Sequence, residues 1–154
     1  MKINSQPVFL GLDYGDRHIG AAVSDALLLT AQPLETIRRS GPESIKKPMA
    51  RLEEIIKVYG VTSIVLGFPK NMDNSLGYRC QATLDFKNRL ERFFKKTPVI
   101  LWDERLTTAQ AERGLAHLNK ARRKQAEDQA AAQLILQNYL DFYRNQQRSA
   151  GELK

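Results

Sequence analysis

Three acidic residues stand where the sequence predicts that buried elements end or begin. Asp13 lies near the end of the apolar run VFLGLDYG, Glu104 follows the apolar run VILW, and Asp128 begins the apolar face of a long helical pattern. An ionised carboxylate loses several kcal/mol when it leaves water without compensation, so a buried one is paired with donors or binds a cation. These three residues are therefore the first candidates for chemistry.

The types of potential ligand in the chain favour a hard metal ion. The sequence contains one cysteine and two histidines, so carboxylates dominate the possible ligands. Carboxylates suit Mg²⁺ or Mn²⁺, whereas imidazole and thiolate suit zinc. Two such ions about 4 Å apart can activate a water and stabilise the leaving oxygen in phosphodiester hydrolysis. We predict that Asp13, Glu104 and Asp128 are both metal ligands and catalytic residues.

Each of these acids also has a structural interpretation. Asp13 could be a turn residue that accepts hydrogen bonds from the amides of Gly15 and Asp16, and Asp128 could cap the N-terminus of a helix. The agreement of three acids with a basic overall charge favours the metal site over these separate structural roles.

Strand and helix patterns alternate along the chain in an order that predicts one mixed α/β sheet. An antiparallel hairpin comes first, and the later strands are parallel and covered by helices. If the strands of Asp13 and Glu104 lie side by side, both acids reach the sheet edge where ligands bind in such folds. Asp103 competes with Glu104, because strand neighbours face opposite ways. The expected strands are 8–15, 18–25, 33–40, 62–69 and 98–102, and the expected helices are 42–59, 78–96, 108–118 and about 128–143.

The charge balance favours an anionic partner. Lysine and arginine number 24 against 17 aspartates and glutamates, a formal net charge of +7, which points to nucleic acid before a membrane. The run ARRK, just before Asp128, is either a solvated loop or a substrate contact. Candidate phosphate contacts are Arg17, Arg38, Arg39, Lys70, Arg105, Arg122, Arg123 and Lys124.

Length and composition indicate one globular domain. We expect it to span residues 1–144, with a flexible tail at 145–154. A single cysteine excludes an internal disulfide, and the opening stretch MKINSQPVFLG lacks a signal-peptide pattern, so we expect a cytoplasmic protein with no membrane partner. We expect a monomer or a weak homodimer.

Four blocks of sequence resemble one known family in order and spacing. They are GLDYGDRHIGAAVSD, IVLGFPKNMDNS, PVILWDERLTTAQAE and EDQAAAQLILQNYL. They resemble the signature blocks of the YqgF or RuvX family of pre-16S ribosomal RNA nucleases. The resemblance implies a ribonuclease H-like fold related to the RuvC Holliday-junction resolvases, with metal-binding acids at Asp13, Glu104 and Asp128. The stretch NSLGYRCQ departs from the more glycine- and glutamine-rich loop expected there, which leaves the substrate loop open.

The first interpretation is a metal-dependent nuclease acting on structured RNA, with precursor 16S rRNA or a pre-ribosomal particle as its partner. A Holliday-junction-type resolvase acting on branched DNA is the nearest alternative, and it would need a stable two-fold dimer. An actin-type ATP-binding domain would use GLDYG as its phosphate loop, but that fold needs two such domains. A non-catalytic nucleic-acid-binding protein remains the third alternative, which a metal titration would separate from a nuclease.

Overall fold

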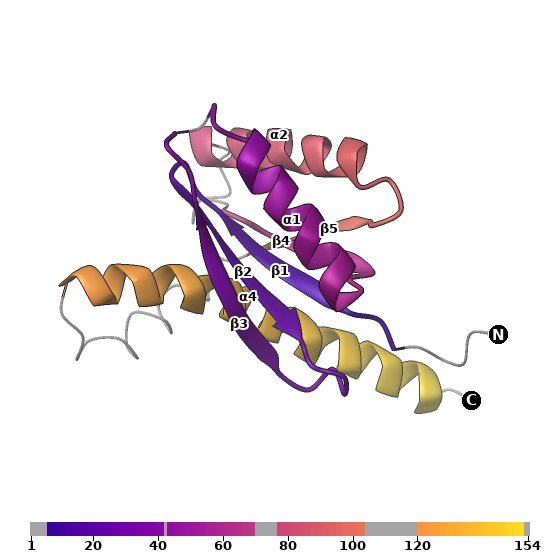
Figure 1. Ribbon diagram of the computed structural model, residues 1–154. Coiled ribbons are helices and arrows are strands. Elements are labelled where there is room, and N and C mark those ends of the chain that lie inside the picture. Colours follow the sequence, from indigo (N-terminus) through magenta and orange to yellow (C-terminus); the bar gives the residue numbers. More distant parts are fainter. Residues whose placement is uncertain (1–5, 42, 70–76, 104–119, 153–154) are drawn as a thin grey trace.

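A mixed five-stranded sheet forms the centre of the molecule (Figure 1). The computed structural model describes residues 6–41, 43–69, 77–103 and 120–152, with side chains at 131–149 in the last segment. The strand order is β3-β2-β1-β4-β5. The strands are β1 (Phe9–Tyr14), β2 (His18–Ser24), β3 (Ala31–Arg38), β4 (Ser63–Phe68) and β5 (Val99–Asp103).

Helices cover both faces of this sheet. The described helices are α1 (Lys46–Tyr59), α2 (Tyr78–Phe93) and α4 (Lys120–Glu152). Figure 1 shows α1 and α2 together on one face and α4 crossing the opposite face. Within the described parts of the chain, no helix is both long enough and apolar enough to cross a membrane.

The predicted order of strand directions is confirmed. Strand β1 pairs antiparallel with β2, which pairs antiparallel with β3, and the pairs β1–β4 and β4–β5 are parallel. One assumption was wrong: β4 lies between β1 and β5, so these two strands are not neighbours. Because β1, β4 and β5 are parallel, their carboxyl ends still meet at one edge of the sheet. We call this the carboxyl edge.

Alternation along the strands divides the core into two layers. Leu10 and Leu12 of β1 belong to the cluster that includes residues of α1 and α2, whereas Phe9 belongs to the cluster beneath α4. Such alternation is the period of a strand, whose successive side chains point to opposite faces. Odd-numbered positions of β1 therefore face α4.

Helix α4 approaches the sheet closely at Gly11. A Cβ atom at Gly11 would stand 2.7 Å from the Cβ of Leu136 and 3.1 Å from the carbonyl oxygen of Ala132. The small side chain of Ala132 allows this approach, and Ala132 is fully buried. Glutamine side chains fix the crossing further, because Gln137 Oε1 accepts from the Ala31 amide (2.9 Å) and Gln133 Nε2 donates to the Ala31 carbonyl (3.1 Å).

The limits of α4 differ from those predicted. It begins at Lys120 instead of about 128 and continues to Glu152, through most of the expected tail. Residues 120–127 and 144–150 are rich in alanine, arginine, lysine and glutamine, which favour helix without any apolar stripe, so an apolar pattern could not reveal them. Phe142 lies at the margin of the buried face of α4, where it is 44% exposed.

Other boundaries moved by a few residues. Strand β3 begins at Ala31, two residues before the predicted start, and α1 begins at Lys46, four residues after it. The short helix predicted at 108–118 lies outside the described residues.

Candidate active site at the carboxyl edge

Asp13 stands in a row of residues that crosses the carboxyl edge. It pairs with Gly20 of β2, and one residue beyond the pair Leu12–Leu66 it comes level with Gly67 of β4. Gly67 in turn pairs with Trp102 of β5. Asp13 is half-buried and lies, by alternation, on the same face as Gly11, which is the α4 face. Gly20 and Gly67, the residues on either side of Asp13 in this row, carry no side chains.

If Asp13 were only a turn residue, its carboxylate would accept hydrogen bonds from the amides of Gly15 and Asp16. One of these two donors is used elsewhere. The Gly15 amide donates to the carbonyl oxygen of His18 (2.8 Å) and so closes the β1–β2 hairpin. Asp13 does interact with other groups of the protein, and its half-buried place next to two glycines also suits a ligand that enters from the α4 face.

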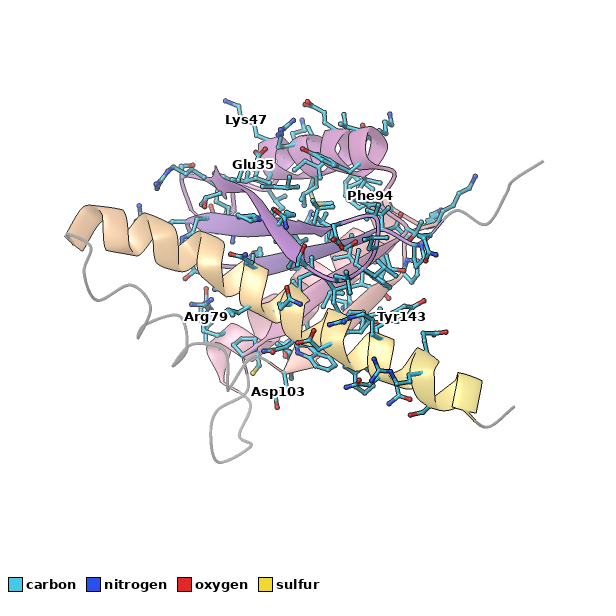
Figure 2. All side chains as sticks on the ribbon, turned by 90° about the horizontal axis from the view of Figure 1, so that it is seen from below. Glu35, Lys47, Arg79, Phe94, Asp103 and Tyr143 are labelled. Carbon is cyan, nitrogen blue, oxygen red and sulfur yellow. The ribbon has the colours of Figure 1, made fainter. Side chains whose placement is uncertain are left out.

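Two arginines hold the backbone that follows Asp13. Arg79 Nη2 donates to the Tyr14 carbonyl oxygen (2.9 Å), and Arg39 donates to the Gly15 carbonyl oxygen through Nε (3.2 Å) and Nη2 (2.8 Å). Figure 2, with α4 in front, shows Arg79 and Asp103 on the same side of this helix. Sequence reasoning missed Arg79, because an arginine in the first turn of a helix carries no signal that it reaches a strand end.

The predicted phosphate contacts fall into three groups: exposed, buried and outside the description of side chains. Arg17 and Arg38 are exposed, as a phosphate contact requires. Arg39 was predicted with them, but its side chain is buried against Gly15. Lys70 and Arg105 lie outside the described residues, and Arg122, Arg123 and Lys124 lie in the first turns of α4, where side chains are not described.

The side chains of two of the three predicted metal ligands lie outside the described part of the structure. Glu104 follows the last residue of β5 and lies outside the described residues, and Asp128 is described as a backbone position of α4 only. Among the described residues, no three His, Cys, Asp or Glu side chains gather in an arrangement that could hold a metal ion. The side chains of Glu104 and Asp128 are not among those residues.

A hairpin followed by parallel strands, with the first strand central and helices on both faces, is the arrangement of ribonuclease H-like nucleases. Among solved structures, T. thermophilus RuvC in complex with Holliday junction substrate superposes with a TM-score of 0.54 at 22% identity, covering 84% of this chain and 92% of that one. The fold is therefore that of the RuvC group of ribonuclease H-like proteins.

The sequence identifies the family within that fold. A family model described as "RuvX: Holliday junction resolvase" matches residues 7–142, and the chain belongs to the RuvX family. Curated relatives carry the name "Putative pre-16S rRNA nuclease". One from Agathobacter rectalis is 48% identical over 88% of this chain and 96% of its own length, and one from Desulfitobacterium hafniense is 51% identical over 88% and 92%. A relative from Staphylococcus aureus is 44% identical over 88% and 96%.

Proposed function

We propose that this RuvX-family protein is a divalent-metal-dependent nuclease that hydrolyses phosphodiester bonds in structured RNA, with precursor 16S rRNA as its substrate. The observation that carries the proposal is the place of Asp13, half-buried between two glycines at the carboxyl edge of a RuvC-like sheet. The substrate class is taken from the relatives, which are named for pre-16S rRNA.

Alternation on β5 favours Glu104 over Asp103 as the second ligand. Ile100 and Trp102 pack with the cluster beneath α4, whereas Leu101 packs with the opposite cluster. Asp103, the next residue, therefore continues on the face opposite to Asp13. If the chain stays extended for one more residue, the side chain at position 104 would point to the α4 face. We assign the ligand role to Glu104 on this ground.

The third proposed ligand is Asp128 on α4. It precedes Ala132 by four residues, so the two positions share one side of the helix. Ala132 lies over Gly11, two residues before Asp13 on the same face of the sheet. Tyr139 and Tyr143, further along α4, contact Phe9 at the start of β1. The helical turn before Ala132 therefore lies toward the carboxyl edge, where the carboxylate of Asp128 would join Asp13 and Glu104.

Three carboxylates form a ligand set that Mg²⁺ or Mn²⁺ prefers. When bound, the ion would lower the pKa of an attacking water and stabilise the negative charge on the leaving oxygen. The protein's own contributions are to hold the carboxylates on one face, to leave space for a phosphate beside Asp13, and to bind the flanking phosphates with basic side chains. The absence of side chains at Gly20 and Gly67, on either side of Asp13, supports such a space.

The basic first turns of α4 are proposed to bind RNA phosphates. Replacing Arg122, Arg123 and Lys124 together with alanine is expected to weaken RNA binding and to reduce the slope of log K against log salt by about 2 to 3, because each lost phosphate contact removes about 0.7 to 0.9 of a unit. Fluorescence anisotropy with labelled RNA at several salt concentrations measures both quantities.

The matched control removes three equal charges at the opposite edge of the sheet. Lys57 lies in the last turn of α1, and Lys95 and Lys96 precede β5, so all three lie near the amino ends of the strands. All three side chains are exposed. Their triple alanine variant is expected to keep most of the salt slope. Equal slopes in the two triple variants would assign the binding to net charge alone.

A DNA-junction resolvase is the second candidate, favoured by the description of the family and by the RuvC complex with a Holliday junction. The deciding experiment offers the purified protein precursor 16S rRNA and a synthetic four-way DNA junction in parallel, with Mg²⁺, while sedimentation measures its oligomeric state. We expect cleavage of the RNA by a monomer or weak homodimer. Symmetric cleavage of the junction by a stable dimer, with the RNA intact, would replace our proposal by the resolvase.

A further inference from the structure

Arg39 is buried where its neighbour Arg38 is exposed. Its residue exposure is 8%. The backbone amide of Arg39 donates to the Arg17 carbonyl oxygen (3.0 Å), and its guanidinium donates twice to the Gly15 carbonyl oxygen (3.2 and 2.8 Å). One residue at the end of β3 therefore holds both sides of the turn that joins β1 to β2.

The same guanidinium lies against an aromatic stack. Its central carbon is 4.6 Å from the centroid of the Tyr14 ring. That ring stacks on Phe86 of α2, with centroids 4.1 Å apart and an interplanar angle of 13°. Phe86 is 2% exposed and belongs to the core. A column of three stacked side chains, Arg39, Tyr14 and Phe86, thus joins the hairpin turn to the core. Its middle member, Tyr14, directly follows Asp13 in the chain.

Burying a guanidinium is costly unless its donors are satisfied and its charge is compensated. Here a backbone carbonyl and the face of a tyrosine supply part of that compensation, and Arg39 makes further interactions within the protein. The planar fork of arginine lets two N–H groups reach one oxygen, which the single ammonium of lysine cannot reproduce. A residue needed only for surface charge would not be built into the fold in this way.

We propose that Arg39 is a positioning residue that fixes the Tyr14–Arg17 turn, and through it Asp13, instead of binding RNA. The inference rests on the proposed role of Asp13 as a ligand. Tyr14 is the direct link, because its ring lies under the guanidinium while its backbone continues from Asp13. Arg79 supports the same residue from α2 through the Tyr14 carbonyl.

The test compares Arg39→Lys with Arg38→Ala and Arg51→Lys. Arg51 makes a comparable multidentate contact, to Glu35 (2.6–3.2 Å), and lies outside the site, so its variant controls for loss of stability. We expect Arg39→Lys to lower kcat for cleavage of precursor 16S rRNA about 10- to 100-fold, with KM and the salt slope of RNA binding unchanged. Hydrogen exchange at the Gly15 amide is expected to accelerate.

Arg38→Ala is expected to show the opposite pattern, with KM raised and the salt slope reduced by about one unit. Arg39→Lys keeps the positive charge, so Arg39→Ala is added as the variant that tests phosphate contact. If Arg39→Lys keeps its kcat while Arg39→Ala raises KM and reduces the salt slope as Arg38→Ala does, Arg39 is a phosphate contact and the inference fails. If Arg39→Lys loses stability as Arg51→Lys does but keeps its kcat and its Gly15 exchange rate, the role is only structural. Should the wild type cleave no RNA, the proposed function fails, while the exchange and binding measurements still decide whether Arg39 holds the turn.

Discussion

Asp13→Asn is expected to lower the rate of RNA cleavage on the order of 10³-fold or more, because it removes a charge from a shared metal site. Glu104→Gln and Asp128→Asn are expected to have effects of the same size. Residues that act as one unit fail together, so the double variants should be little worse than the single ones. Single-turnover cleavage of end-labelled precursor 16S rRNA measures each rate.

Asp103→Asn is the matched control for Glu104→Gln, since it neutralises the adjacent carboxylate on the opposite face of β5. It is expected to keep a rate near that of the wild type. In metal-free protein, clustered carboxylates repel one another, so Asp13→Asn is expected to have an equal or higher melting temperature. A variant of Asp13, Glu104 or Asp128 that cleaves RNA normally would remove that residue from the ligand set.

Gly11→Ala is expected to destabilise the protein by about 1–3 kcal/mol, the usual range for overpacking a close contact. The added methyl would stand 2.7 Å from the Cβ of Leu136 and 3.1 Å from the Ala132 carbonyl oxygen. Neither atom is the flexible end of a side chain, so α4 itself must shift. Because that shift would displace Asp128, we also expect a loss of cleavage at temperatures where the variant is folded. Urea unfolding measures the free energy.

Gly41→Ala is the control for this variant, since an added methyl at Gly41 meets no atom within 4 Å. It is expected to change the free energy of unfolding by less than about 0.5 kcal/mol, as substitutions away from packed contacts usually do. If the two variants have the same stability, the close approach of α4 at Gly11 is not what fixes the helix.

Much of the fold follows from local patterns. The hairpin of β1 and β2, the apolar periodicity of α1 and α2, and the parallel strands β4 and β5 are all visible in the sequence, because each pattern records which side of one element is buried. The order of the strands in the sheet is not determined by local patterns. Nothing in the run VILW shows that β4 would separate β5 from β1.

The candidate site shows the same limit. The types of the three acids suggested metal chemistry, but the row Gly20, Asp13, Gly67 and Trp102 depends on the register between strands, which a single sequence does not contain. Arg39 is the clearest example. At the end of a strand it is indistinguishable from Arg38 in sequence, and only the tertiary structure shows that one guanidinium is buried on Gly15.

The central claim is that the carboxyl edge of this sheet cleaves RNA with the help of a divalent metal. It is tested most directly by incubating the purified protein with precursor and mature 16S rRNA in Mg²⁺, in Mn²⁺ and in chelator, and mapping the 5′ ends of the products. We predict that the precursor is cleaved toward its mature 5′ end in Mg²⁺ or Mn²⁺, and that the chelator abolishes cleavage. Full cleavage in chelator, or intact precursor under all three conditions, would contradict this account.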